Sequence, residues 1–295
     1  MDIRLITYFL AVVDEGNFSK AAKRLHISQP SLSKAIQDLE NMLGLQLLHR
    51  TTRSVETTEE GRFFYDEGVR LVTYFRHVER EMQRLKERGL PQLRIGMMES
   101  VKHWLMDVIQ EFRTTDQETL IRLREVLSVE DVRHVLETFE ADIVITNHVL
   151  MDETIASIKL YEEPMALLIH QSHRLAKKEK WSVSDYLTTD WIMFPEGFQT
   201  RKNTQSYFHN HNVFPPVAYE VERFETAVSL VEKNLGVTFL PESYVMRLPD
   251  SLPLKMIRMK DSALRRSVYL NYLTSRHLSP MMQRFIEMIQ SRYIS

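Results

Sequence analysis

The sequence has no cysteine, and only eight of its 295 residues are glycine. Without cysteine the chain can form neither disulfides nor thiolate metal sites, so it suits a reducing compartment. The scarcity of glycine and the absence of G-x-x-x-x-G-K, G-x-S-x-G and H-E-x-x-H motifs argue against nucleotide hydrolases, serine hydrolases and zinc proteases. The chain also lacks a basic leader and any apolar run near the ~20 residues of a membrane helix. We therefore expect a cytoplasmic protein without a membrane segment.

Two histidines in the stretch His209-Asn210-His211 are the best candidates for metal ligands. Side chains two positions apart point the same way only in extended backbone, whereas the flanking residues have a helical pattern. A surface pair is therefore the favoured interpretation, and neither a metal nor another cofactor is expected.

Apolar residues between Phe18 and Gly44 recur at the spacing of two short helices. Ser28 before Pro30 is typical of the start of the second helix, because serine caps it and proline needs no N–H there. Gly44 suits a left-handed C-cap. The two apolar stripes are Phe18, Ala21, Ala22 and Leu25, and then Leu32, Ala35, Ile36, Leu39 and Leu43. The pattern predicts a helix-turn-helix, preceded by a helix at 3–13 and followed by a two-stranded wing at 45–55.

The face opposite these stripes is polar and basic. Between Gly16 and Val55, six lysines and arginines face two acidic residues, a net charge of +4 in a chain whose total is −2. Charge concentrated in this way favours a polyanion, although solvated lysines around a small helical core remain the alternative. Polar groups near a helix start suit base edges, and basic groups suit phosphates. The candidate DNA-contacting residues are Phe18, Ser19, Lys20, Ser28, Gln29, Pro30, Ser31, Ser33, Lys34, Gln37, Arg50 and Arg53.

The run AAKRLHISQPSLSKAIQDLENMLGLQLLHRTTRSVETTEEG resembles the winged helix-turn-helix of the LysR-type transcriptional regulators. The matching residues include Ala21, Ala22, Leu25, Ser28, Gln29, Pro30, Ser31, Leu39, Glu40, Gly44, Thr58 and Gly61, while Leu48 stands where the family usually has phenylalanine. The resemblance implies a regulator, not an enzyme, that binds pseudo-palindromic double-stranded DNA as a homodimer or homotetramer. It also implies a small-molecule effector, and it leaves RNA polymerase open as a partner.

A long helix is predicted from Glu59 to Arg88, opened by a capping box of Thr57 and Glu60. Its apolar residues recur in steps of three and four, broken only at Gly68, and define a seam: Phe64, Leu71, Phe75, Val78, Met82 and Leu85. The seam packs either on its own domain or on a second chain. One helix-turn-helix contacts only half of a two-fold site, so we expect a second chain.

Beyond Pro91 the pattern changes to alternating strands and helices, which is typical of parallel α/β structure. Strands are predicted at 93–96, 120–127, 142–146, 165–170, 191–194, 217–222, 237–241 and 268–273. The resemblance implies an effector domain of two α/β lobes, similar to periplasmic binding proteins. Phe139 and Asn234 stand where that family usually has glycine. The expected domains are a winged helix-turn-helix at 1–58, a linker helix at 59–90, lobe 1 at 91–161 plus 267–295, and lobe 2 at 162–266.

An effector is expected where strands end and helices begin, because free N–H groups collect there. The candidate effector-binding residues are Ser100, Lys102, Ser128, Asn147, Gln199, Thr200 and Arg201. Lys102 and Arg201 could hold a carboxylate, whereas Glu99 would oppose an anion and select a cationic or hydroxylated ligand. The charge of the ligand therefore stays open, and each hydroxyl has the alternative role of a helix N-cap.

The sequence also allows a second class of protein as an alternative to a regulator. A small-molecule enzyme or binding protein could use its N-terminal helices only for assembly, and binding to promoter DNA would separate the two. Neither the effector, nor the target genes, nor the choice between activation and repression follows from the sequence.

Overall fold

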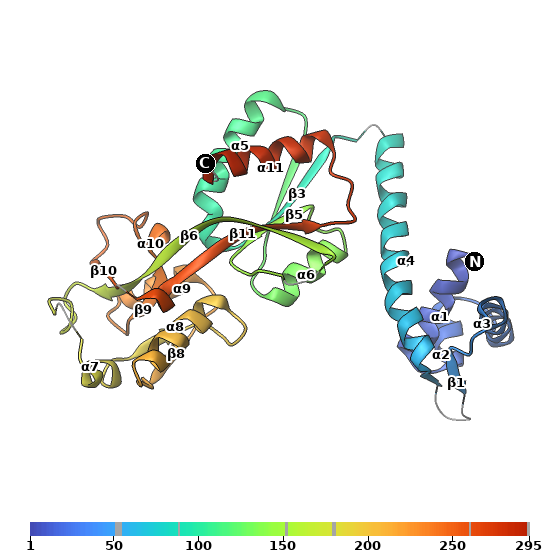
Figure 1. Cartoon of the computed structure of the whole chain (residues 1–295), viewed down its shortest axis with the longest axis horizontal. Helices are drawn as coiled ribbons and strands as arrows, with labels where there is room; N and C mark the ends of the chain where they lie inside the picture. The colour runs from blue at the N-terminus through green and yellow to red at the C-terminus, as the bar shows by residue number, and fades with distance from the viewer. Residues whose placement is uncertain (51–54, 88, 151–152, 179–180, 260, 294–295) are drawn as a thin grey trace. The chain divides into compact units, whose positions relative to one another are not determined.

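A computed structural model of the chain describes residues 1–295 except 51–54, 88, 151–152, 179–180, 260 and 294–295 (Figure 1). The chain divides into two compact units. One comprises Met1–Gly89 with Glu137–Phe139, and the other comprises Leu90–Leu136 with Glu140–Ser295.

The first unit is a winged helix-turn-helix followed by a long helix, as predicted. Its elements are α1 (Ile3–Glu15), α2 (Phe18–Arg24), α3 (Gln29–Leu43), β1 (Leu48–Arg50), β2 (Val55–Thr57) and α4 (Glu59–Lys86). The Ser28 side chain accepts a hydrogen bond from the Ser31 N–H, with Pro30 in the first turn, and Gly44 closes α3 at φ 68°. The predicted start and end of α3 are therefore confirmed. Phe9, Leu32, Ile36 and Leu39 are fully buried between the helices.

The base of the wing is fixed by two side chains, those of Glu40 and Thr58. The Glu40 carboxylate accepts hydrogen bonds from the Leu47 and Leu48 N–H groups at 2.9 and 3.1 Å. The Thr58 hydroxyl donates to the Gln46 carbonyl at 2.8 Å and accepts from the Gly61 N–H at 2.9 Å. Thr58 is thus the N-cap of α4, and the prediction of a capping box at Thr57 is wrong.

The second unit contains a mixed sheet whose order is β10-β6-β11-β5-β3-β4, with β9 also paired to β6. Its strands are β3 (Gln92–Met97), β4 (Leu120–Glu125), β5 (Ile143–Thr146), β6 (Ile155–His170), β9 (Thr238–Pro241), β10 (Leu254–Arg258) and β11 (Arg265–Leu273), with β7 (Trp191–Met193) and β8 (Val217–Glu220) as a separate parallel pair. Strands β3, β4 and β5 are parallel, as predicted, whereas β6 and β11 are antiparallel to their neighbours. β6 starts ten residues before the expected 165–170 strand, and β10 was not predicted.

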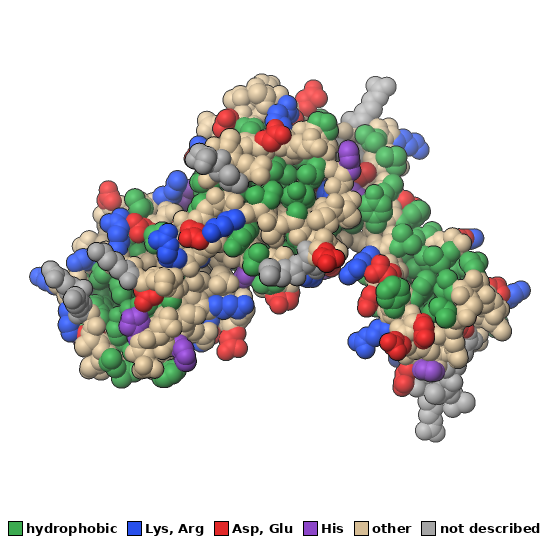
Figure 2. Space-filling model, viewed as in Figure 1, with side chains coloured by type: hydrophobic (Ala, Val, Ile, Leu, Met, Phe, Trp, Pro, Cys, Tyr) green, Lys and Arg blue, Asp and Glu red, His purple; other side chains and the backbone are tan. Residues whose placement is uncertain are grey.

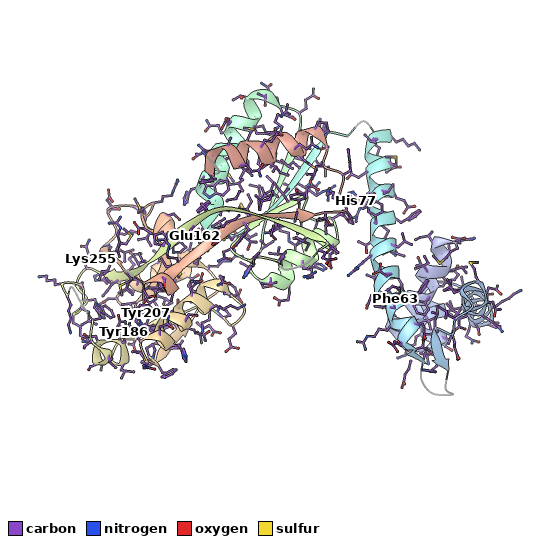
Figure 3. The ribbon with its side chains drawn as sticks, viewed as in Figure 1. Phe63, His77, Glu162, Tyr186, Tyr207 and Lys255 are labelled. Atoms are coloured by element: carbon purple, nitrogen blue, oxygen red, sulfur yellow. The ribbon has the colours of Figure 1, made fainter. Side chains whose placement is uncertain are left out.

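Helices cover this sheet in two lobes that β6 and β11 join. The helices are α5 (Lys102–Thr115), α6 (Val129–Glu137), α7 (Val183–Leu187), α8 (Gln199–Asn210), α9 (Phe224–Glu232), α10 (Glu242–Val245) and α11 (Pro280–Tyr293), with short 3-10 turns η1 (Glu99–Val101) and η2 (Ser262–Leu264). In lobe 1, α5 and α11 pack on one another (Figure 1), and the rings of Phe112 and Phe285 meet edge to face at 5.2 Å. In lobe 2 the buried hydroxyls of Tyr186 and Tyr207 lie 2.6 Å apart (Figure 3). None of the helices in the described part of the chain combines the length and apolar character that a membrane span needs.

Gly61 provides a test of how the wing is fixed. A Cβ at this position would lie 1.9 Å from the Leu47 carbonyl oxygen, which is backbone and cannot rotate away. We expect Gly61→Ala to displace the wing from α4, lowering both the melting temperature and DNA affinity. Thermal melting followed by circular dichroism and a DNA titration would measure the two effects.

Gly44→Ala is the matched control, because Gly44 has a positive φ but no atom within 4 Å of the added Cβ. That substitution should cost only the ~1 kcal/mol of a left-handed alanine. Equal melting temperatures for the two variants would contradict the role assigned to Gly61.

Candidate DNA-binding surface and inter-lobe cleft

The exposed face of α3 carries the polar residues expected to contact DNA. Gln29, Ser31, Lys34 and Gln37 are exposed and Ser33 is partly buried. The Ser31 hydroxyl lies 2.7 Å from that of Ser28, so part of its hydrogen-bonding capacity is used within the cap.

Helix α2 presents Ser19 and Lys20 at its first turn, and both are exposed. The Asn17 side chain accepts hydrogen bonds from the backbone N–H groups of these two residues at 2.9 and 3.0 Å. Phe18 is partly buried against the helical core, so its ring serves packing first. On the wing, Arg50 is the last residue of β1, and Arg53 lies outside the described residues.

The net positive charge of the DNA-binding unit is smaller than the count over residues 16–55 indicated. Arg24 lies 3.2 Å from Asp14 and 3.3 Å from Glu15 of α1, which were outside the counted window. Over residues 1–58, seven basic residues face six acidic ones. Exposed positive charge on α2 and α3 therefore rests mainly on Lys20, Lys23 and Lys34.

One member of the seam predicted along α4 is packed inside the first unit, and the other five are exposed. Phe64 packs inside the first unit, where its ring meets that of Phe9 edge to face at 5.2 Å. The other five members are 38 to 59% exposed: Leu71, Phe75, Val78, Met82 and Leu85. Figure 2 shows hydrophobic side chains gathered over α4. Phe63 on the same helix is 70% exposed (Figure 3).

A small cavity of about 40 Å³ lies between the two lobes of the second unit. It is lined by Met98, Glu99, Ser100, Val126, Leu127, Asn147, Phe198, Gln199, Thr200, Glu222, Phe224 and Arg266. Four of the seven candidate effector-binding residues, Ser100, Asn147, Gln199 and Thr200, are therefore brought together.

The other three candidates do not line this cavity. Lys102 is exposed at the start of α5. The Ser128 hydroxyl accepts a hydrogen bond from the Asp131 N–H at 3.1 Å, so it serves as a cap of α6. Arg201 donates to the Phe194 carbonyl at 3.3 Å and lines a different cavity, of about 510 Å³, along α8.

Ser100 is held by a buried charge pair rather than by a helix cap. It lies in the turn η1, which has no side-chain cap, so the N-cap alternative is wrong for this residue. Its hydroxyl accepts a hydrogen bond from Arg266 Nη2 at 2.6 Å. Arg266 also contacts Glu163, with Nε 2.8 Å from Oε1, and both side chains are almost fully buried. The Ser243 hydroxyl donates to the same Glu163 carboxylate.

Glu99 reaches from lobe 1 to the first turn of α9 in lobe 2. Its carboxylate accepts hydrogen bonds from the Phe224 N–H at 2.8 Å and the Glu225 N–H at 3.3 Å. The Tyr244 hydroxyl donates to it at 3.3 Å. Burial, and then the negative charge of Glu99, raise the pKa of Tyr244. Beside this contact Arg223 of lobe 2 pairs with Glu125 of lobe 1.

His148 is the buried titratable group that follows β5. Burial, and then the positive charge of Lys202, lower the pKa of His148 to about 4, although the nearby Glu130 acts in the opposite direction. His148 is thus neutral near pH 7. His209 and His211, the pair expected on the surface, are both exposed, and His211 Nδ1 lies 2.8 Å from the Tyr207 carbonyl oxygen. Within the described residues no group of three metal-binding side chains is formed.

Comparison with known families identifies both units. Residues 3–62 match the bacterial regulatory helix-turn-helix protein, lysR family, and residues 87–293 match the LysR substrate binding domain. The chain belongs to the LysR family of transcriptional regulators, and it is a DNA-binding regulator with an effector-binding domain rather than an enzyme.

Individual relatives share this organisation. The regulator BenM of Acinetobacter baylyi is 30% identical over 250 residues, which cover 82% of this chain and 81% of BenM. The Hca operon transcriptional activator HcaR of Escherichia coli is 27% identical over 247 residues, 82% of each chain. Full-length BenM has a similar structure, with a TM-score of 0.59, 27% identity and coverage of 99% and 97%. CbnR complexed with its target DNA shares the fold, with a TM-score of 0.56, 21% identity and coverage of 99% of each chain.

Proposed function

We propose that the chain controls transcription in the cytoplasm by binding a two-fold promoter site through α3 and the wing. The observation that carries this proposal is the exposed polar face of α3, whose start is fixed by the Ser28 cap. Gln29 and Ser33 suit base edges in a major groove, and Lys34 suits a phosphate. Arg50 at the end of β1 is a further candidate for a phosphate contact, as is Arg53, which lies outside the described residues.

The exposed part of the α4 seam supports assembly into a homodimer or homotetramer. Five large apolar side chains in steps of three and four are a substantial area for a single helix to leave in water. A second copy would cover them and would supply the second helix-turn-helix that a two-fold site needs. RNA polymerase is a further partner that a regulator bound at a promoter would meet.

We place the effector in the cavity between the lobes. Ser100, Asn147, Gln199 and Thr200 supply hydrogen-bonding groups from both lobes, with apolar groups such as Phe198 beside them. A ligand that contacts both lobes shifts their arrangement by the difference between its affinities for the two states. That arrangement would alter the spacing of DNA-binding units within an oligomer.

Two substitutions on α3 test the DNA surface. Gln29→Ala should lose roughly 1–3 kcal/mol on the specific site and reduce discrimination between sequences. Lys34→Ala should weaken specific and nonspecific DNA alike and lower the salt dependence by about one unit of slope. Gel shifts and salt titrations on the promoter region beside the protein's own gene would measure both. Lys177→Ala, an exposed lysine of lobe 2, is the control, and a Lys34→Ala slope equal to the control's would exclude Lys34 from the contacts.

Phe75→Glu tests assembly through the α4 seam. The substitution would place a charge in an apolar helix pair, which can avoid burying it only by separating. Analytical ultracentrifugation should show smaller species, and promoter affinity should fall because the half-sites are no longer linked. Phe63→Glu lies outside the seam and should sediment like the unmodified protein. A Phe75→Glu variant that sediments unchanged would mean that the seam does not hold copies together.

Ser100→Ala tests the effector site. Loss of the hydroxyl removes the acceptor of the Arg266 hydrogen bond and a ligand-facing group, so effector affinity should fall about tenfold. Binding of effector-free protein to DNA should be unchanged. The effector would first be found by thermal-shift screening of metabolites, and titrations on DNA would follow. Ser128→Ala is the matched control, since its hydroxyl caps α6 outside the cavity and should cost only about 1 kcal/mol of stability. A normal response from Ser100→Ala would remove this cavity as the effector site.

A further inference from the structure

The positive groups at the inter-lobe cavity already have anionic partners within the chain. Arg266 is the single cation among the described residues that line it, and its guanidinium is matched by the buried Glu163. The two basic residues expected to hold a carboxylate, Lys102 and Arg201, lie elsewhere. A carboxylate entering the cavity would therefore find no cation among the described lining residues that lacks a counter-charge.

The N-terminus of α9 is a feature that would attract an anion, and Glu99 occupies it. The start of α8, whose Gln199 and Thr200 line the same cavity, has no side-chain cap. The amides of Phe224 and Glu225, together with the Tyr244 hydroxyl, surround the Glu99 carboxylate with three donors. This is the arrangement by which a helix start and a phenol would hold a ligand carboxylate. Here the carboxylate comes from the opposite lobe of the same chain.

The charges that remain at the cavity are negative. The lining contains two acidic residues, Glu99 and Glu222, whereas its basic residue Arg266 is already paired with Glu163. Glu222 is exposed, and its carboxylate accepts no hydrogen bond from the described residues. Neighbouring apolar side chains, among them Met98 and Phe224, lower the local dielectric and so increase the cost of a second anion.

We propose that Glu99 is a specificity residue of the cleft: it fills the anion site at α9, excludes ligand carboxylates from those donors and favours a neutral or cationic effector that donates hydrogen bonds there. This inference rests on the proposed function, which places the effector in the same cavity. It makes Glu99 a specificity residue, in contrast to the hydrogen-bonding lining supplied by Ser100 and Thr200.

Removal of the Glu99 side chain with acetate as the probe tests this role. Glu99→Ala deletes one methylene and the carboxylate, which together have the heavy-atom skeleton of acetate. The full-length variant should bind acetate at least about tenfold more tightly than the unmodified protein, because acetate can take up the vacated donors. The readout is the rise in melting temperature with sodium acetate, compared with sodium chloride at equal ionic strength. Methylammonium chloride should stabilise the unmodified protein more than the Glu99→Ala variant.

Two further variants distinguish the effect of freeing the α9 amides from the effect of removing one negative charge. Glu222→Ala changes the net charge by the same amount but leaves the α9 amides occupied, so acetate should have no added effect. Glu99→Gln keeps an acceptor oxygen and the volume, and it should fold without gaining acetate binding. Acetate that stabilises the unmodified protein as much as Glu99→Ala, or that stabilises Glu222→Ala equally, would overturn the inference.

Different results would contradict the role of Glu99 and the location of the effector site. An effector that occupies the cavity and places a carboxylate against the α9 amides would contradict the selectivity but keep the cavity as the effector site. A normal effector response from Ser100→Ala would remove the cavity as the effector site without altering the acetate result on Glu99→Ala.

Discussion

The buried pair of Arg266 and Glu163 is the interaction on which the effector-binding unit depends. The two residues face each other in the ladder between β11 and β6, the strands that join the lobes. Burial of two charges costs several kcal/mol per ion, and only close geometry with further hydrogen bonds offsets that cost. Ser100 supplies one of these bonds from lobe 1 and Ser243 supplies another from lobe 2. A change in the angle between the lobes therefore acts on the hydrogen bonds of a buried ion pair.

The DNA-binding unit uses a carboxylate in a comparable way at its surface. Glu40 counted as a negative charge opposing DNA in the sequence, yet its role in the structure is to hold the first amides of the wing. A charge-assisted hydrogen bond to backbone is stronger than a neutral one, which suits a short strand pair that has little core of its own. Gly61 of α4 packs closely on the Leu47 backbone, whose N–H is bonded to Glu40. The wing and α4 are therefore held at the same residue.

The sequence predicted local structure better than it predicted contacts between distant residues. Caps, apolar stripes and parallel strands depend on neighbours in the chain, and α3 with its Ser28 cap and Gly44 end was predicted correctly. Phe139 and Asn234, noted as departures from glycine, do adopt positive φ angles of 59° and 57°. By contrast, nothing near Ser100 in the sequence indicates Arg266, which lies 166 positions later. Glu99 was noticed as a charge that opposes anions, but its partners at α9 are 125 positions away. β10 was missed because its pattern of partly exposed residues has weak alternation.

The position of β11 in the sheet has a consequence for biosynthesis. β11 lies between β5 and β6, although it follows both by more than ninety residues. During translation the sheet of lobe 1 therefore has an open edge on β5 until residues 265–273 have left the ribosome, and α11, which packs on α5, is later still. The winged helix-turn-helix and α4 lie within the first 89 residues, and domains generally fold as units, N-terminal ones first. The nascent chain would thus carry a folded helix-turn-helix well before it can close its cleft, and chaperones that shield unpaired strand edges would have most to act on in that interval.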